Sequence, residues 1–145
     1  MTKIFEEELH FLNQVEDKND ECYGERDTYD TNTIEKLKIE FPNLPNDYFC
    51  YLQEIGWGSF RECSFMVYSS PANLQEFGVG DLYVNIPANY IFFGDDMSGD
   101  YAGFDITATK DEVIELWHED ETIYQTKKTF KQYIREKMRF KKKKI

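Results

Sequence analysis

The chain has 145 residues, of which 41% are hydrophobic and 17% aromatic, so it is long enough for one domain with a substantial core. Its net charge of −11 is unevenly placed: residues 127–145 carry ten basic groups and one acid (+9), which leaves −20 on residues 1–126. Such an acidic body disfavours binding to nucleic acids and anionic lipids, and it favours either a basic protein partner or simple solubility.

Cysteine usage and hydropathy indicate a reducing compartment. The three cysteines, Cys22, Cys50 and Cys63, are an odd number without a Cys-x-x-Cys pair, so we expect reduced thiols in a cytoplasmic protein. The first residues lack the basic region and apolar stretch of a secretory signal. There is no apolar run of roughly 18 residues, and we therefore expect no membrane span.

The first 30 residues predict a helix followed by a loop. Apolar residues recur at helical spacing over residues 3–16, and residues 6–8, all glutamate, occupy polar positions in the first turn, where they complement the helix dipole. Thr2 is a possible cap. Residues 17–30 are polar and acidic, which predicts a mobile loop.

Two further helices are expected before the strands begin. Residues 31–33 (Thr-Asn-Thr) offer the amino-terminal cap of the first of them. The second covers about residues 46–55, with Pro45 at its first helical position and Gly56 as its stop. The broad apolar arc of this helix predicts burial against a sheet.

The middle of the chain predicts strands. We expect one at residues 63–68, broken by Ser-Ser-Pro at 69–71, whereas residues 72–89 give little signal beyond a possible helical turn. Aromatic and β-branched residues at 90–93 and 101–106 flank a polar, glycine-containing turn, which predicts a β-hairpin at the centre of the fold.

The carboxy-terminal part predicts two strands and a helix. The strands cover residues 113–117 and 122–124, and an acidic turn joins them. The helix starts near Thr126 or Thr129 and runs to about Arg139, with basic residues in its last turn.

This order of elements predicts an α+β fold: a mostly antiparallel sheet flanked by amino-terminal helices and one carboxy-terminal helix. We assign residues 1–140 to a single domain and residues 141–145 to a basic flexible tail. The four lysines of the tail are compatible with a solvated end or with a weak tether to an anionic surface.

Metal and cofactor chemistry find little support. The Asp cluster of the central hairpin fails the spacing of a calcium loop, because position twelve counted from Asp95 is Ile106 instead of glutamate. Aspartates that accept backbone N–H groups of a turn are the simpler interpretation. We expect no metal and no cofactor.

Catalysis is also a minority interpretation. His10 and His118 have no nucleophile close in the sequence, and no phosphate-binding glycine loop is present. Trp57 and Trp117 are expected to pack in or beside the core. No catalytic residue is assigned.

The acidic charge gives the best candidates for partner binding. Charged groups of this kind raise association rate and specificity more than net affinity. The candidates are Asp95, Asp96, Asp100, Glu119, Asp120 and Glu121.

Three motifs in order resemble a known family. Leu44-Pro45 opens an aromatic helix that ends in Gly56-Trp57-Gly58. A strand then ends in a motif similar to Phe-Gly-Asp-x-x-Gly-Asp, here residues 93–100 with Gly94 and Gly99 and one residue more, before Phe104-Asp105. A closing helix similar to residues 129–134 follows. The pattern resembles the SMI1/KNR4 (SUKH) superfamily over about residues 31–138.

This resemblance implies an α+β domain without enzymatic activity. Bacterial members are similar to immunity proteins that bind and neutralise a cognate toxin, often a nuclease, whereas fungal members regulate cell-wall signalling. The short chain resembles the bacterial kind, so we expect an immunity protein; the alternative is an intracellular regulatory interaction module. The additional Asp95 and the lysine tail depart from the pattern, and the identity of the toxin does not carry over.

Overall fold

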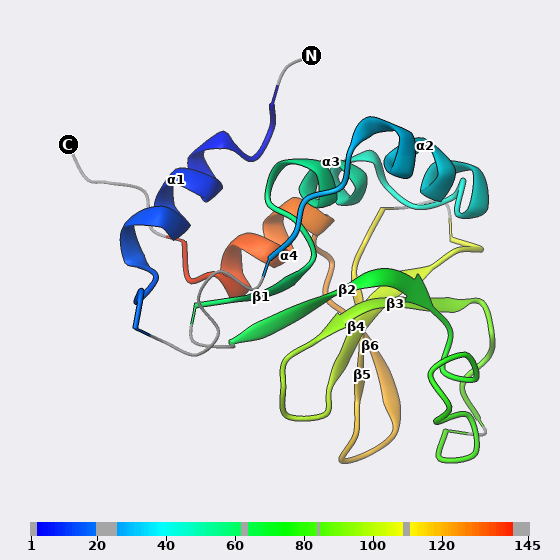
Figure 1. The fold of residues 1–145 in the computed structure, drawn as a ribbon. Coiled ribbons are helices and arrows are strands. Elements are labelled where there is room, and N and C mark those ends of the chain that lie inside the picture. Colours follow the sequence, from blue (N-terminus) through cyan, green and yellow to red (C-terminus); the bar gives the residue numbers. More distant parts are fainter. Residues whose placement is uncertain (1–2, 20–25, 62–63, 84, 109–110, 141–145) are drawn as a thin grey trace.

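Figure 1 shows the computed structural model, which describes residues 3–19, 26–61, 64–83, 85–108 and 111–140. Within these ranges three helices precede six strands, and a fourth helix follows them, which confirms the predicted α+β class. The helices are α1 (Glu6–Val15), α2 (Thr31–Glu40), α3 (Asn46–Glu54) and α4 (Phe130–Lys137). The strands are β1 (Gly58–Phe60), β2 (Phe65–Ala72), β3 (Tyr90–Asp95), β4 (Tyr101–Asp105), β5 (Ile114–Trp117) and β6 (Thr122–Gln125).

The six strands form one sheet in sequence order, and each strand pairs antiparallel with the next. Every connection therefore joins neighbours, as in a meander. The central pair is β3 and β4, with Ile91 opposite Phe104, so the predicted hairpin is confirmed. Strand β1 was not predicted from the sequence, yet Gly58 pairs with Val67 of β2.

The predicted break of β2 at residues 69–71 is wrong, because the strand starts at Phe65 and continues to Ala72. Pro71 is tolerated for two reasons. The pairing of β2 with β1 ends at Val67, and the register with β3 shifts between Val67 and Ala72. A proline at such an irregular edge interrupts no regular ladder hydrogen bond.

Helix starts differ from the predictions by a few residues. Helix α1 begins at Glu6, and Glu8 is 1% exposed instead of lying on a polar face, with its carboxylate 3.8 Å from Nζ of Lys131. The cap of α2 is Asp30, whose side chain accepts the N–H of Thr33 at 2.8 Å. Pro45 is the N-cap of α3, one position before the predicted one.

Helix α4 begins as one of the two alternatives predicted. Thr129 is its N-cap, and the side chains of Thr129 and Gln132 each accept the other residue's backbone N–H, which completes a capping box. Its first residue, Phe130, is fully buried beneath α3, where its ring packs edge-on against Tyr48 and Tyr51.

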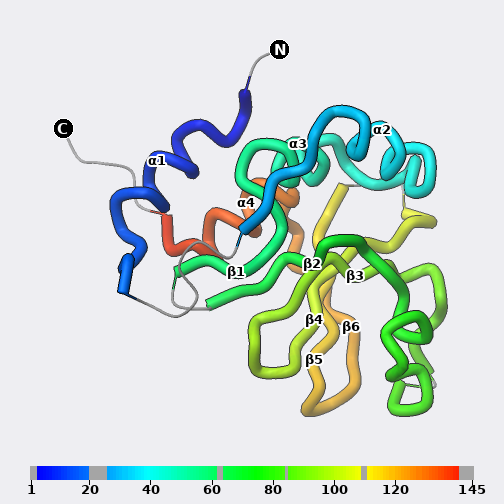
Figure 2. The backbone as a smooth tube through the Cα atoms, in the orientation of Figure 1, coloured from blue at the N-terminus to red at the C-terminus, as the bar shows by residue number. Residues whose placement is uncertain are grey.

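The two faces of the sheet are covered differently (Figure 1). Helices α1, α3 and α4 pack on one face over an aromatic core that includes Phe65, Phe93 and Phe104. The opposite face packs against the loop of residues 73–89, where Leu74 and Phe77 meet Phe92. Figure 2 follows this loop as the green segment beside the strands. Helices alone therefore do not enclose the sheet.

The part of residues 17–30 that the structure describes is anchored. The guanidinium of Arg26 forms two hydrogen bonds of 2.7 Å with the carboxylate of Glu16, and Asp27 forms a bridge with Trp57. Residues 26–30 therefore do not follow the prediction of a mobile loop, because they lie along α3 and β1.

Several sequence predictions lie outside the described residues: the Thr2 cap, residues 20–25 of the expected loop, Cys22, Cys63, and the tail of residues 141–145. Among the residues described, no helix combines the length and apolar character that crossing a bilayer would require.

Candidate functional site

The turn between β3 and β4 is built by its own aspartates. Asp95 accepts the hydroxyl of Tyr68 at 2.6 Å and the N–H of Met97 at 2.8 Å. Asp96 accepts the N–H and hydroxyl of Ser98 at 2.9 and 2.8 Å, and the N–H of Asp100 at 3.2 Å. These carboxylates hold the turn, as the simpler sequence interpretation expected.

The same contacts perturb two pKa values. Partial burial opposes ionisation of Asp96, but the hydrogen bonds from Ser98 and Asp100 outweigh it and lower the pKa of Asp96. Burial, together with the carboxylate of Asp95 as acceptor, raises the pKa of Tyr68 far above its usual range. The lowered pKa keeps Asp96 ionised at neutral pH, and the raised pKa keeps Tyr68 protonated as a hydrogen-bond donor.

A histidine joins this turn to the turn between β5 and β6. The backbone N–H of His118 donates to Oδ1 of Asp100 at 3.0 Å, and its Nδ1 lies 2.7 Å from the same oxygen. This hydrogen bond raises the pKa of the exposed His118. Asp100 and His118, which are 18 residues apart in the sequence, thus join the two hairpin turns at one end of the sheet (Figure 1).

The acids of the second turn have different roles. Asp120 accepts the N–H of Thr122 at 3.2 Å and the hydroxyl of Tyr124, so it supports the turn. Glu119 and Glu121 are exposed, and neither side chain forms a hydrogen bond or ion pair with another described residue. Of the six predicted partner-binding residues, these two offer the most accessible carboxylates.

An apolar groove of about 680 Å³ lies beside the turn between β3 and β4, called the first turn below. It lies on the sheet face opposite the helices, because Met66 and Tyr68 alternate along β2 with Phe65 and Val67 of the helix-side core. Phe77 of the 73–89 loop forms one wall. The lining also includes Trp57, Ser69, Ser70, Asp95, Met97, Gly99 and Tyr101.

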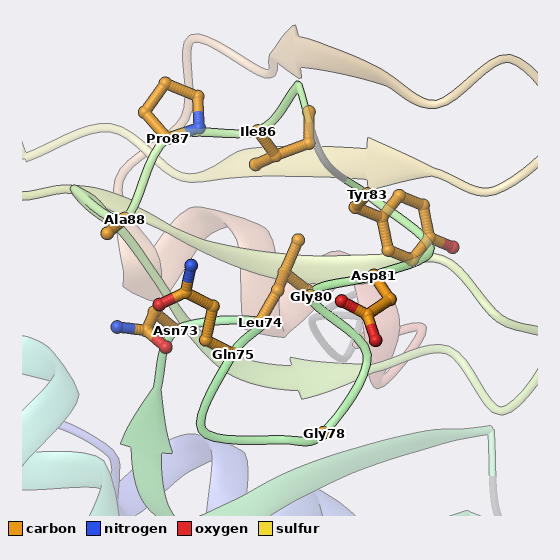
Figure 3. A pocket seen from close by; sticks show the side chains of 10 residues that line it. All are labelled: Asn73, Leu74, Gln75, Gly78, Gly80, Asp81, Tyr83, Ile86, Pro87 and Ala88. Atoms are coloured by element: carbon orange, nitrogen blue, oxygen red, sulfur yellow. The ribbon is translucent and has the colours of Figure 1, made fainter.

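A second cavity, of about 420 Å³, is enclosed by the 73–89 loop itself. Figure 3 shows its lining, which comes entirely from that loop and includes Asn73, Asp81 and Tyr83. None of the residues singled out in the sequence lines this cavity. It has no charged group besides Asp81, and its position inside one loop makes it a packing feature of that loop.

The family-motif residues shape the scaffold. Gly56 follows α3 with φ of +103°, and a Cβ there would lie 2.4 Å from the carbonyl oxygen of Asp27. Gly94 lies where β2 passes closely: a Cβ would come within 2.2 Å of the carbonyl oxygen of Met66. Leu44, Pro45, Gly58 and Phe104 are buried, Trp57 is half-buried, Gly99 belongs to the first turn, and Asp105 accepts hydrogen bonds from Asn89 and Thr107.

Both histidines lie at the surface. The two hydrogen bonds given by His118 both go to Asp100, and His10 contacts Gln14 on the exposed side of α1. Among the described residues, no group of three or more His, Cys, Asp or Glu is placed to hold a metal ion.

Trp117 departs from the expectation of core or rim packing. Its side chain is 40% exposed and stacks on Tyr124 at a ring-centroid distance of 4.1 Å, beside the second turn.

The sequence did not predict the apolar groove, since Met66, Phe77 and Met97 are far apart in the sequence. The one available signal was Met97, an apolar residue within a polar turn.

One known protein family matches most of this chain. A family model described as SMI1-KNR4 cell-wall (SUKH_6) matches residues 9–134, a span that begins within α1, earlier than the motifs suggested. Neither the curated proteins nor the solved structures give a match. Because the family model covers most of the 145 residues, the chain belongs to the SMI1-KNR4 cell-wall family, SUKH_6.

Proposed function

We propose that this protein is a cytoplasmic immunity protein of a bacterial toxin system. It binds a cognate toxin domain, a basic protein and in the simplest case a nuclease, and it neutralises the toxin by covering its active site. It performs no reaction of its own. Family membership supports a protein-interaction role in general, and the proposal extends this role to a toxin.

One observation carries the proposal: the two acidic turns meet at one end of the sheet through Asp100 and His118. Glu119 and Glu121 of the β5–β6 turn are exposed, and Asp95 and Asp96 belong to the β3–β4 turn that His118 joins to it. A nuclease active site binds phosphates through basic side chains. A rigid cluster of carboxylates fits such a surface by charge complementarity.

The hydrogen bonds within the turns add pre-organisation. Asp95, Asp96 and Asp120 are held by turn N–H groups and by tyrosine hydroxyls, so little loop ordering is required on binding. Glu119 and Glu121 then provide long-range attraction, which increases the association rate.

Co-expression with the toxin encoded beside the gene tests the proposal. We expect the two proteins to co-purify one-to-one and the chain to relieve the growth arrest that the toxin causes. A regulatory module would have no toxin-like neighbour. If the adjacent toxin neither binds nor loses its toxicity, the proposal fails.

Charge reversal locates the surface. The double variant Glu119→Lys, Glu121→Lys is expected to lower the association rate with the toxin about tenfold or more at low salt, with a smaller effect at high salt. The matched control reverses Glu7 on α1 and Glu40 on α2, both exposed and outside the two turns. If both double variants slow association equally, net charge acts without a specific surface.

A further inference from the structure

We propose that the apolar groove beside the β3–β4 turn receives a large apolar side chain of the protein partner, and that a lysine or arginine next to it in the partner pairs with Asp95. The proposal rests on the proposed function, because it names the chemistry of the partner segment that this end of the sheet would bind. It adds an anchor to a surface so far described only by charge.

The walls of the groove are apolar and already open. Trp57, Met66 and Tyr68 come from the β1–β2 edge, Phe77 from the 73–89 loop, and Tyr101 from β4. The Tyr68 and Phe77 rings pack edge-on at 5.1 Å, and Phe77 stacks on Tyr101 at 6.3 Å, so three rings form a continuous wall. A groove of about 680 Å³ is large enough for a leucine, methionine or phenylalanine side chain.

Met97 lines the groove and is held there at a conformational cost. Its φ is +70°, a left-handed conformation that is unfavourable for a residue with a Cβ. The carboxylate of Asp95 stabilises this conformation by accepting the N–H of Met97. The turn therefore leaves a flexible, polarisable side chain 51% exposed, and such a side chain adapts to an apolar ligand.

Asp95 is the charged residue of the groove lining. Its two oxygens accept from Tyr68 and Met97, and no lysine or arginine pairs with it among the residues that the structure describes. A carboxylate has room for further donors on both oxygens. A cation from the partner would thus meet a charged acceptor that is already oriented.

Charge selects the occupant. A second copy of this chain has a net charge of −11 even with its basic residues 127–145, so the acids of both turns repel it as a whole. A basic segment is attracted by the same field, and the apolar lining requires one large apolar residue within it. The occupant is therefore a basic segment of a partner protein with an apolar anchor.

A selection from phage-displayed random peptides against the intact chain tests this inference without any toxin. We expect enriched peptides to share a large apolar residue with Lys or Arg beside it. Replacing the anchor by alanine in a synthetic peptide should weaken binding about 10- to 100-fold, the usual value of one buried apolar side chain.

Two variants of the chain place the peptide. Met97→Glu replaces an apolar side chain of the groove lining by a carboxylate, which opposes burial of the apolar anchor, and Asp95→Asn removes the acceptor charge while keeping the size of the side chain. The matched controls are Leu82→Glu, at an apolar side chain 67% exposed in the 73–89 loop, and Glu40→Gln on α2. Circular dichroism and the thermal midpoint confirm that each variant is folded.

The expected result is at least a fivefold loss of peptide affinity for Met97→Glu and Asp95→Asn, with both controls unchanged. No enrichment, a consensus without the basic and apolar pair, or equal binding by groove and control variants overturns the inference. Toxin binding that is unaffected by the groove variants leaves the proposed function intact and refutes the groove. Peptide binding in the groove without toxin binding supports the groove and refutes the proposed function.

Discussion

Glu16 links three distant parts of the chain, and its removal is the sharpest test of the fold. Its carboxylate accepts both Nη atoms of Arg26 at 2.7 Å and the backbone N–H of Arg61 at 3.1 Å. The two side chains are 6% and 12% exposed. The contact therefore ties the end of α1 to residue 26 and to the turn after β1.

The magnitude follows from this burial. In Glu16→Ala the largely buried guanidinium of Arg26 loses both hydrogen bonds to this carboxylate, and the N–H of Arg61 loses its acceptor. Removing one partner of a buried, hydrogen-bonded ion pair costs about 3–5 kcal/mol of unfolding free energy. A domain with a total stability of about 5–15 kcal/mol would lose a large fraction of it.

Urea unfolding followed by tryptophan fluorescence and circular dichroism measures the change. With an m-value of about 2 kcal/mol/M, the midpoint should fall by about 2 M. The matched control is Glu7→Ala, an exposed glutamate in the first turn of α1, with an expected cost below about 1 kcal/mol.

A double variant separates charge from packing. Glu16→Leu with Arg26→Met removes both buried charges, so it should recover part of the stability that Glu16→Ala loses. A loss below about 1 kcal/mol for Glu16→Ala, or a double variant less stable than the single one, would show that the ion pair does not hold these segments together.

Three further predictions address the elements around the candidate surface. Gly94→Ala places a Cβ only 2.2 Å from the carbonyl oxygen of Met66, so it should lower the free energy of unfolding in urea by about 2 kcal/mol or more. An unchanged midpoint would contradict the close approach of β2 and β3. Thr129→Ala removes the capping hydroxyl of α4 and should lower the free energy of unfolding by about 1 kcal/mol in the same assay, whereas Thr129→Ser, which keeps the hydroxyl, should retain most of the stability. An equal loss of stability in both variants would exclude a role of the hydroxyl. Because Asp100 raises the pKa of His118, their contact stabilises the fold fully at a pH below the ordinary histidine pKa of 6.5, and this stabilisation is lost as the pH rises through the raised pKa. NMR titration should show the pKa of His118 returning towards 6.5 in Asp100→Asn, and an unchanged pKa would refute the link.

Local patterns were sufficient where the chain interacts mainly with its own neighbours. The apolar stripe of residues 46–55 and the glycine after it predicted α3 and its end, and the aromatic segments around the acidic turn predicted the β3–β4 hairpin. The ordered motifs also identified the family correctly. Each helix, turn or single motif among these signals is local in the sequence, so apolar periodicity and turn chemistry indicate it directly.

Errors arose where distant segments decide the outcome. Local rules place the end of a strand at Pro71, because proline has no backbone N–H to donate. Strand β2 nevertheless continues, since its pairing with β1 ends at Val67 and its register with β3 shifts before Ala72. Glutamate is usually a surface residue, but Glu8 is buried because Lys131, which is distant in the sequence, lies close to its carboxylate. The loop of residues 73–89 has no periodic pattern, because its order comes from packing on the sheet.

The sequence by itself determined the fold class, the family, and the excess of negative charge on residues 1–126. Only the tertiary structure decided which acids hold a turn and which extend into solvent, that Asp100 and His118 join the two hairpins, and that a groove opens beside Met97. The reason is physical: composition and periodicity follow from each residue's neighbours along the chain, whereas a surface is made by residues that meet only after the sheet has paired.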